Sequence, residues 1–435
     1  MSHYQRYPAY RDSCVEWIGE IPGHWEVKQT RHIFKIFSGS TPKSGEELYW
    51  DGDITWFTPD DLGNNQQKNI SESRRKITEE GYKSCGTSLA KKNSIVFSTR
   101  APIGHIALST VPACCNQGCR ILEPENGNTD YWYYTLASAK PILQSLGQGS
   151  TFMELPRQSL ASFNLPFPPH EEQQAIASFL DRKTAEIDEL ITRKKELLKK
   201  LDEKRTALIT RAVTKGLAPS APMKESGVEW LREIPKHWEV KQTRLIFKIF
   251  SGSTPRSGEE LFWDGDIVWF TPEDLGNNQP KNISESRRKI TEEGYNSCGT
   301  SLAKSNSVVL STRAPIGHFA ISTVPACCNQ GCRILEPENG IPEYWYYTLL
   351  SAKPILQCLG QGSTFMELPR QSLAGFKLPV PPLEEQQAIA EHIEKKTATI
   401  DRQKAQVTEA IERLKEYRSA LITDTVTGKM NVQLL

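Results

Sequence analysis

The stretch LPFPPHEEQQAIASFL, Leu165–Leu180, returns as LPVPPLEEQQAIAEHI at Leu378–Ile393. In each copy prolines fix how the chain enters, and two glutamates fill the turn that follows, which is how helices begin. Short apolar runs precede each stretch and a long heptad pattern follows it. The stretch therefore marks a boundary between a folded domain and a helix, and the chain contains that boundary twice.

The duplication extends far beyond this boundary. Shifting the chain by 213 positions aligns residues 13–214 with residues 226–427 without a gap. From residue 13 to residue 170, 133 of 158 positions are identical, whereas from residue 171 to residue 214 only 22 of 44 are. A repeat of this length indicates two whole domains, because the units of a solenoid are roughly 20–50 residues long.

The first part of each repeat predicts a mixed α/β domain. The runs IFKIFSG (Ile33–Gly39), DITWFTP (Asp53–Pro59) and SIVFSTR (Ser94–Arg100) are rich in β-branched and aromatic residues and predict strands. YWYYTLASAKPIL (Tyr131–Leu143) has helical spacing, with Pro141 near its end. The expected fold class is α+β, with two mixed domains at residues 1–170 and 219–383 and two long helices at residues 171–218 and 384–430.

The two helical stretches have the seven-residue repeat of a coiled coil. Apolar or long-stemmed residues recur in steps of four and three, Leu190 and Leu197 among them, and the second copy keeps the register. We expect the helices to pair as an antiparallel coiled coil with pseudo-twofold symmetry, although a helical hairpin that merely stiffens a binding protein would show the same pattern. The assigned seam residues are Leu180, Ile187, Leu201, Leu208, Ile393, Ile400, Val407, Leu414 and Leu421.

Composition and charge exclude several classes of protein. The formal net charge of +1 over 435 residues means that a nucleic-acid surface would have to be a local basic patch. No apolar run reaches the roughly 18 residues of a membrane span, and the first residues lack the apolar core of a signal peptide. We expect a cytoplasmic protein without a membrane partner.

Six of the ten cysteines belong to one duplicated motif, CCNQGC, at Cys114–Cys119 and Cys327–Cys332. The motif lacks a fourth ligand and the hairpin spacing of zinc sites, so buried thiols in a reducing compartment are expected and a metal is not.

No residue is assigned a catalytic role. The sequence contains no phosphate-binding loop, no H-E-x-x-H and no Asn-Pro-Pro-aromatic segment of an amino-methyltransferase. The histidines that could be imagined as bases have no evident acidic partner, so structural roles are expected for them. They are His24, His105, His237 and His318.

The ordered set of motifs in each copy resembles a known family. The motifs S-G-S-T-P (Ser38–Pro42), K-I-T-E-E-G (Lys76–Gly81), S-T-R-A-P-I-G (Ser98–Gly104) and C-N-Q-G (Cys115–Gly118) precede P-P-x-E-E-Q and a long helix. This order resembles the specificity subunit of type I restriction-modification systems over nearly the whole chain, twice. The resemblance implies two target recognition domains, each followed by a spacer helix, in a subunit that performs no chemistry itself.

The resemblance also implies partners. The chain would read a bipartite target in double-stranded DNA and hold two modification subunits, which methylate adenine with S-adenosylmethionine. Restriction subunits that use ATP and Mg²⁺ would join them, and this chain itself would need no cofactor. Two alternatives stay open: a stand-alone DNA-binding or scaffold protein without a methyltransferase partner, and a fused enzyme whose active site has no recognised motif.

The near identity of the two domains departs from the usual family pattern, in which two dissimilar domains read an asymmetric target. We hypothesise that both domains read the same half-site and that the target is a palindrome interrupted by an unspecified spacer. Among the few differences, Asp60 and Glu273 preserve the character of the side chain, whereas Lys92 and Ser305 differ in charge.

Four loops in each copy have a composition suited to DNA, because base edges are read by Arg, Lys, Asn, Gln, Ser and Thr, and phosphates by cations. They are Ser38–Glu47, Leu62–Asn69, Glu72–Lys76 and Gly147–Phe152. The basic cluster at Glu72–Lys76 is the expected phosphate clamp, and the asparagine-rich loop suits adenine. The candidate DNA-binding residues are Ser40, Thr41, Lys43, Asn64, Asn65, Gln66, Lys68, Arg74, Arg75, Lys76, Gln148, Ser150, Thr151, Ser253, Thr254, Arg256, Asn277, Asn278, Gln279, Lys281, Arg287, Arg288, Lys289, Gln361, Ser363 and Thr364.

Each loop also has an ordinary structural explanation. Asparagine-rich segments often form plain turns, a basic cluster is often a solvated face, and G-S-T can cap a helix. Arg100 and Arg313, which follow a strand in each copy, suit a buried ion pair as well as a DNA contact.

Overall fold

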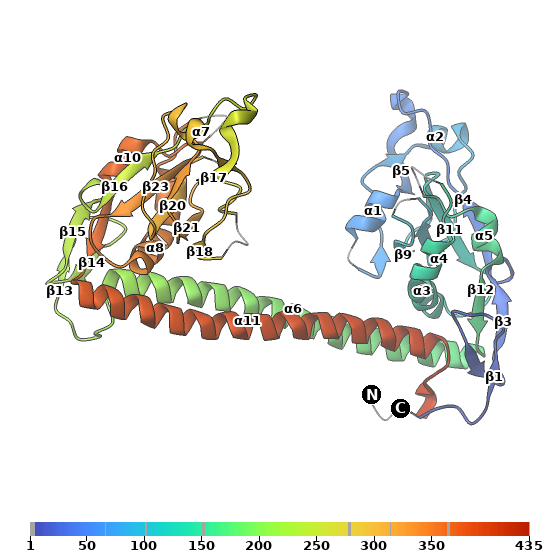
Figure 1. Cartoon of the computed structure of the whole chain (residues 1–435). Coiled ribbons are helices and arrows are strands. Elements are labelled where there is room, and N and C mark those ends of the chain that lie inside the picture. Colours follow the sequence, from blue (N-terminus) through green and yellow to red (C-terminus); the bar gives the residue numbers. More distant parts are fainter. Residues whose placement is uncertain are drawn as a thin grey trace. The chain divides into compact units, whose positions relative to one another are not determined.

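The structure is a computed structural model that describes residues 5–65, 67–100, 102–149, 153–276, 280–313, 315–362 and 366–434. It divides into two compact units, residues 1–194 with 409–435 and residues 195–408. Each unit contains one mixed α/β region and one half of each long helix, α6 (His170–Lys215) and α11 (Leu383–Val426) (Figure 1).

The mixed region of the first unit is built on two main sheets. The larger has the order β4-β11-β8-β9-β6, and the smaller has the order β10-β5-β7. The strands of the larger sheet are β4 (Phe34–Ser38), β11 (Cys119–Pro124), β8 (Ser94–Ser98), β9 (Ile106–Ser109) and β6 (Asn69–Ile70). Those of the smaller sheet are β10 (Ala113–Cys115), β5 (Trp50–Phe57) and β7 (Lys76–Ile77). The other strands are β1 (Tyr10–Asp12) with β2 (Glu20–Pro22) and β3 (Glu26–Gln29) with β12 (Asn164–Phe167).

Short helices connect these strands. They are α1 (Pro59–Asn64), α2 (Glu79–Ser84), α3 (Thr129–Ser138), α4 (Lys140–Ser145) and α5 (Arg157–Ser162), with 3-10 turns η1 (Thr30–His32) and η2 (Glu47–Tyr49). The strands predicted at the three apolar runs are confirmed as β4, β5 and β8. The helix predicted at Tyr131–Leu143 is instead two helices, because Pro141 lacks a backbone N–H and lies in the first turn of α4.

The second unit repeats this arrangement. Its larger sheet is β16 (Phe247–Ser251), β23 (Cys332–Pro337), β20 (Ser307–Ser311), β21 (Phe319–Ser322) and β18 (Asn282–Ile283), and its smaller sheet is β19 (Lys289–Ile290), β17 (Trp263–Phe270) and β22 (Ala326–Cys328). The remaining strands are β13 (Met223–Glu225), β14 (Glu233–Pro235), β15 (Glu239–Gln242) and β24 (Lys377–Val380). The helices are α7 (Glu292–Asn296), α8 (Pro342–Ser351), α9 (Lys353–Cys358) and α10 (Arg370–Gly375), and the 3-10 turns are η3 (Thr243–Leu245), η4 (Glu260–Phe262) and, in the first unit, η5 (Val432–Leu434).

A buried core lies between the two sheets of each mixed region. In the first unit Phe57 of β5 packs with Val96 of β8, Ile121 of β11 and the thiols of Cys115 and Cys119. Every residue of β8 is buried, because other strands flank it and the core covers it. The predicted apolar strand therefore forms the centre of the fold.

The long helices pair antiparallel within each unit. In the first unit Arg418 of α11 lies 2.9 Å, Nε to Oδ1, from Asp188 of α6. In the second, Arg205 of α6 lies 3.4 Å from Asp401 of α11 between the same two atoms. These two ion pairs occupy equivalent positions of the repeat. The antiparallel pairing expected from the heptads is thus confirmed, with the start of one helix lying against the end of the other.

The seam of the helix pair differs in part from the heptads read from the sequence. Six of the nine assigned seam residues are buried, and Leu208, Val407 and Leu414 are half-buried. Leu190 and Leu197, however, are 42% and 43% exposed, and Ile191 is buried instead. The alternate positions of the seam therefore fall one residue later than expected. The leucines at the predicted positions are misleading because leucine is a good helix former and also occurs on the solvent face of helices.

Polar contacts fix the boundary at which α6 begins. The hydroxyl of Tyr7 and the indole N–H of Trp25 both donate to Oε2 of Glu172 at 2.9 Å, and Nε2 of His24 lies 2.6 Å from its Oε1. The Glu172 side chain is only 6% exposed. The absence of an acidic partner for His24, expected from the sequence, is therefore wrong, since the partner lies 148 residues later in the chain.

The second copy repeats this network without the tyrosine. Trp238 donates to Oε2 of Glu385 at 3.0 Å, and His237 lies 2.5 Å from its Oε1, so the same correction applies to His237. Ser220 stands at the position equivalent to Tyr7, and the Glu385 side chain is 40% exposed. Burial and the nearby Glu172 carboxylate raise the pKa of Tyr7 above its usual value, so this phenol stays protonated and can donate.

The last turn of each long helix accepts a hydrogen bond from the mixed region of the unit in which that helix ends. The hydroxyl of Tyr131 donates to the carbonyl of Val426 at 3.1 Å, and that of Tyr344 donates to the carbonyl of Val213 at 3.5 Å. Gly428 follows α11 with a φ of 75°, a conformation that favours glycine after a helix. Each mixed region is therefore bound to the start of one helix and to the end of the other.

No described helix is long and apolar enough to cross a lipid bilayer.

We predict that Glu172→Ala destabilises the protein more than Glu385→Ala. Removing the buried Glu172 carboxylate leaves the Trp25 and Tyr7 donors without an acceptor, at a cost of about 2–4 kcal/mol, whereas the exposed Glu385 should cost about 1 kcal/mol. Thermal unfolding of the full chain would show the larger decrease in melting temperature for Glu172→Ala. Equal decreases would contradict a special role for the first boundary.

Candidate nucleic-acid interface

The loop at Ser38–Glu47 is held against the C-N-Q-G turn. The backbone N–H of Ser40 donates to the carbonyl of Cys115 at 3.0 Å, and the hydroxyl of Thr41 donates to the side-chain oxygen of Gln117. A Cβ on Gly39 would lie 1.9 Å from the carbonyl oxygen of Asn116, so only glycine permits this approach. Ser253, Thr254 and Gly252 repeat the same contacts in the second unit.

Two indoles of β5 donate hydrogen bonds to carbonyls of the same loop. Trp56 donates its Nε1–H to the carbonyl of Ser40 at 2.9 Å, and Trp50 donates to the carbonyl of Lys43 at 3.2 Å. The two rings meet edge to face with centroids 5.2 Å apart. Lys43 itself is exposed, and Arg256 occupies its place in the second unit.

The basic cluster lies beside these indoles. The guanidinium of Arg75 lies over the ring of Trp50, 3.6 Å from its centroid, and the backbone N–H of Arg74 donates to Asp61 at 2.8 Å. Lys76 is half-buried in β7. In the second unit Arg288 lies 3.5 Å from the centroid of Trp263, and Lys289 is half-buried in β19.

The exchange of Asp60 for Glu273 changes more than its conserved charge suggests. The longer Glu273 side chain reaches the guanidinium of Arg287, which also lies 3.4 Å from Asp274. No carboxylate among the described residues pairs with the side chain of Arg74 in the first unit. The net charge around this arginine is therefore the same in the two copies, but its side chain is paired only in the second.

The described part of the predicted loop at residues 147–152, residues 147–149, belongs to the same surface. Gln148 and Glu154 exchange two backbone hydrogen bonds of 2.8 and 2.9 Å, and Glu154 lies 2.9 Å from Arg100 and 3.9 Å from Arg120. Gln361 and Glu367 repeat the bridge, and Arg313 pairs with Glu367 at 2.9 Å. Arg100 and Arg313 thus form partly exposed ion pairs. Four candidates lie outside the described residues: Ser150, Thr151, Ser363 and Thr364.

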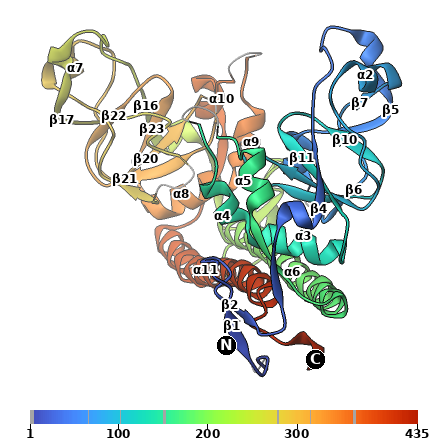
Figure 2. The same cartoon turned by 90° about the vertical axis from the view of Figure 1, so that its right-hand side faces the viewer.

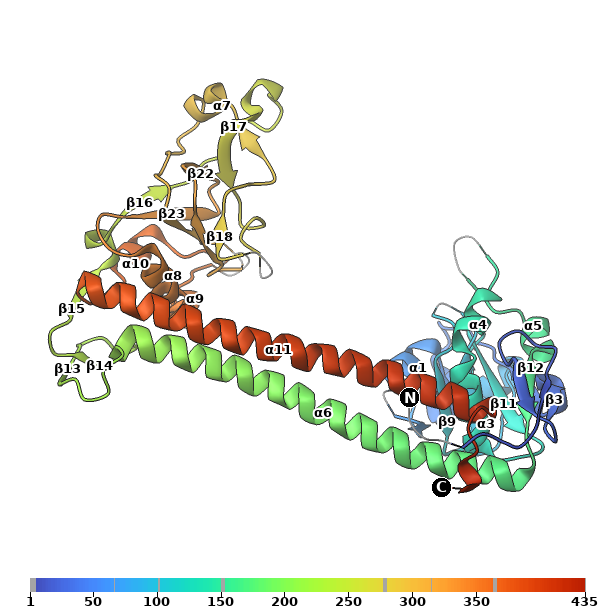
Figure 3. The same ribbon diagram turned by 60° about the horizontal axis from the view of Figure 1, so that its bottom comes forward.

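Three of the four predicted loops therefore join into one surface, which we call the loop rim. It comprises residues 38–47, 72–76, 116–120 and 148–149 with 153–154, and the equivalent described residues of the second unit. Gln117 and Arg120 were not predicted, although the unchanged return of C-N-Q-G-C-R could have pointed to them. In the second unit α7, beside the basic cluster, lies at the end of the mixed region away from the long helices (Figures 1, 2 and 3), and α2 lies likewise in the first unit (Figures 1 and 2).

The fourth predicted loop lies elsewhere. The ammonium of Lys68 lies 2.6 Å from Asp130 and 2.5 Å from Asp181 of α6, and its counterpart Lys281 pairs with Glu394 of α11. These lysines bind the mixed region to a long helix, so we leave them out of the loop rim. Asn65 donates its side-chain amide to the carbonyl of Gln67 at 2.8 Å, as in an ordinary turn, while Asn64 is exposed. Gln66, Asn277, Asn278 and Gln279 lie outside the described residues.

The cysteine motif supplies core side chains. Cys114, Cys115 and Cys119 and their copies are buried. Burial raises the pKa of Cys114 and Cys327 to about 12, so both are protonated thiols at neutral pH. No group of three or more potential metal ligands occurs among the described residues.

Burial, aided by Lys140 and Lys353, lowers the pKa of His105 and His318, which keeps these imidazoles neutral near pH 7.

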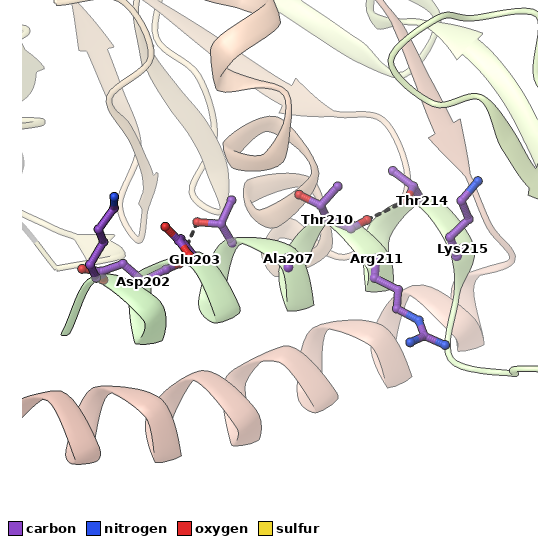
Figure 4. Close-up of a pocket in the computed structure, with 9 residues that line it drawn as sticks. Asp202, Glu203, Ala207, Thr210, Arg211, Thr214 and Lys215 are labelled. Carbon is purple, nitrogen blue, oxygen red and sulfur yellow. Dashed lines mark hydrogen bonds between the residues drawn. The ribbon is translucent and has the colours of Figure 1, made fainter. Parts of the chain in front are cut away.

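A hollow lies along α6 within the second unit. Figure 4 shows Thr210 and Thr214 on the opposite side of the helix from Arg211. Charged side chains and the small side chains of three threonines and an alanine line it, and these polar groups do not converge as in a catalytic pocket. The lining residues are Lys199, Asp202, Glu203, Thr206, Ala207, Thr210, Arg211, Thr214 and Lys215.

We predict that Gly39→Ala weakens both the fold of the rim and binding to DNA. The added methyl group must displace the Asn116 backbone, at a cost of about 1–3 kcal/mol. Gly45→Ala, in the same loop, is the matched control, because nothing lies within 4 Å of its Cβ position. Unfolding and duplex-binding assays of both variants would test this, and similar behaviour of the two would contradict it.

We predict that thiol alkylation at pH 8 labels Cys14 and Cys358 first, since both are exposed. The six motif cysteines should react only after unfolding, because their raised pKa and burial leave almost no accessible thiolate. Mass spectrometry of peptides after timed labelling would identify the modified residues. Rapid modification of any of the six in the folded chain would contradict the buried core described here.

The chain is similar in sequence to known proteins over almost its full length. A family model described as the type I restriction modification DNA specificity domain matches residues 22–200 and again 235–413. The MjaIX specificity subunit of a type I restriction enzyme from Methanocaldococcus jannaschii is 30% identical over 96% of both chains. The EcoR124I/EcoR124II specificity subunit from Escherichia coli is 31% identical over 41% of this chain and 45% of its own length.

Solved structures share the fold. A chain from a study of complex assembly and conformational transition in a type I restriction-modification system has a TM-score of 0.73 at 16% identity, covering 93% of this chain and 98% of its own. The HsdS subunit from Thermoanaerobacter tengcongensis has a TM-score of 0.54, also at 16% identity, over 94% and 98% of the two chains.

Proposed function

Because this chain belongs to the family of type I restriction-modification DNA specificity subunits, we propose that it reads a bipartite DNA target made of two like half-sites around an unspecified spacer. Proteins of this family are the non-catalytic components that recognise DNA. The observation that supports two like half-sites is the repetition of the loop rim, with the same hydrogen bonds and the same stacked arginine in both units.

The antiparallel helices supply the argument for a palindrome. Each mixed region binds the start of one helix and the end of the other through equivalent contacts. An antiparallel pair looks the same when turned end for end, so domains attached to it in this way would meet a duplex in opposite directions. Two inverted copies of one half-site would match such a reader, as operator symmetry mirrors protein symmetry elsewhere.

We further propose that the long helices hold two modification subunits, which would methylate adenine with S-adenosylmethionine, and that restriction subunits using ATP and Mg²⁺ join them. The support is the exposed polar face of α6 and α11 opposite their buried seam. Such a face leaves a long surface for partner chains. A subunit that acts on chromosomal DNA in this way would work in the cytoplasm.

Genome-wide adenine methylation mapping tests this proposal. A host that lacks other such systems would express the full chain with its modification subunit, and long-read sequencing would locate methylated adenines. We expect one interrupted palindrome, methylated in both halves. Two unlike half-sites would overturn the palindrome while keeping the bipartite target. Absence of methylation, together with failure of the chain to co-purify with the modification subunit, would point to a stand-alone DNA-binding or scaffold protein.

A further inference from the structure

One arginine in each unit lies flat on a buried indole. The centre of the Arg75 guanidinium is 3.6 Å from the ring centroid of Trp50, and that of Arg288 is 3.5 Å from the ring centroid of Trp263. At these distances the guanidinium is stacked on the ring. Although 25 of the 158 aligned positions differ between the copies, the arginine, the indole and their geometry are the same.

The fold holds the indole rigidly. Trp50 and Ile54 both pair with Ile77 of β7, so the three residues between them bulge out of the strand, and Asp51 takes a φ of 60°. Trp50 is only 5% exposed, and its N–H is fixed by the carbonyl of Lys43. The edge of the ring packs against Trp56. The strand bulge, the hydrogen bond to Lys43 and the contact with Trp56 therefore fix the plane of the Trp50 ring, and a fixed ring can orient a group that stacks on it.

The arginine backbone is fixed as well. The hydroxyl of Ser73 donates to the carbonyl of Arg75 at 2.6 Å and accepts from the backbone N–H of Trp56 at 3.2 Å. Ser286 makes the same two bonds, to Arg288 and Trp269, at 2.7 and 3.1 Å. Both the main chain and the plane of the side chain are therefore set before any ligand arrives.

Neither of these arginines forms an ion pair with a carboxylate in the described part of the chain. Both side chains belong to exposed residues. Among the neighbouring arginines, Arg100 pairs with Glu154 and Arg287 pairs with Glu273, whereas Arg74 shares the lack of a carboxylate partner among the described residues. Among the residues that the structure describes, no carboxylate lies within 4 Å of the nitrogens of Arg75 or Arg288.

The geometry limits what such a group can bind. The indole covers one face of the guanidinium, so its N–H edge is left to donate two parallel hydrogen bonds in one plane. The O6 and N7 atoms of guanine in the major groove form a planar pair of acceptors that matches this edge. Arginine also binds phosphate through two parallel hydrogen bonds, but flexible lysines bind phosphate as well. A platform that fixes the plane of the guanidinium therefore favours a base.

We propose that Arg75 and Arg288 are specificity-determining residues, each reading one guanine in its own half-site. This inference rests on the proposed function, because it assumes that each unit contacts one half-site. The two arginines then act independently. Each half-site serves as an internal control for the other.

The test uses the full-length wild-type chain and the variants Arg75→Lys and Arg288→Lys. Each would be incubated with a library of randomised DNA duplexes, and the bound fraction sequenced. Lysine keeps the positive charge but cannot donate two parallel bonds in a fixed plane. Arg193→Lys, the same exchange at an exposed ion pair on α6, is the matched control. Thermal unfolding would establish that all variants are folded.

We expect each rim variant to lose its preference for guanine at one position of one half-site, by about 5- to 150-fold, while the other half-site is unchanged. An equal loss of affinity on all sequences, with an unchanged salt dependence, would identify a phosphate contact and overturn the inference. Unchanged selection would also overturn it, leaving the proposed function intact. Failure of the wild-type chain to enrich any sequence would overturn both.

Discussion

The carboxylate at the start of each long helix, buried in Glu172 and partly exposed in Glu385, is the interaction on which the rest of the structure depends. Glu172 accepts hydrogen bonds from the indole of Trp25 and the hydroxyl of Tyr7 while His24 lies against its other oxygen, and Glu385 repeats the first and last of these contacts. A carboxylate in such a site is stable only when its acceptor positions are filled. The segment that enters each mixed region is thereby bound to the first turn of the helix that leaves it.

This contact binds each mixed region, with the loops that it carries, to the start of a long helix. The lysine pairs at the helix side, Lys68 with Asp181 and Lys281 with Glu394, add a second attachment between each mixed region and a long helix. The loops that we assign to DNA are instead bound to each other, through Gly39, Thr41, Gln117 and the two indoles of β5. Attachment and recognition thus use different loops of the same small region, so the rim can vary while the attachment to the helices is kept.

Much of the fold could be predicted from the sequence, because its strongest patterns are local or repeated. The Pro-Pro-x-Glu-Glu boundary gives the helix starts, β-branched runs give β4, β5 and β8, and an internal repeat needs no knowledge of contacts. The predicted seam is wrong at alternate positions because buried polar residues, Thr184 and Thr397, occupy some of the true seam positions. Each satisfies its hydroxyl on a carbonyl one turn earlier, within its own helix, which a hydrophobic pattern cannot reveal.

The candidate site was predicted less well for a different reason. Composition identifies residues that can contact DNA, but the partner that occupies a charged side chain lies far away in the chain. Lys68 finds its carboxylate 113 residues later, and Arg100 finds Glu154 54 residues later. The sequence predicts Arg75 only as one cation of a phosphate clamp, because its stacking on Trp50, 25 positions earlier, depends on a bulge in β5 that no local pattern predicts.

The proposed function requires that the two nearly identical regions read the same bases. The most direct measurement is to replace residues 13–170 by residues 226–383, so that both regions are copies of the second, and to map methylation by this chain with its modification subunit. If both regions read the same bases, the methylated target is the same interrupted palindrome as for the parent chain. A target with a changed half-site would contradict it, because the 25 exchanged residues would then determine which bases are read.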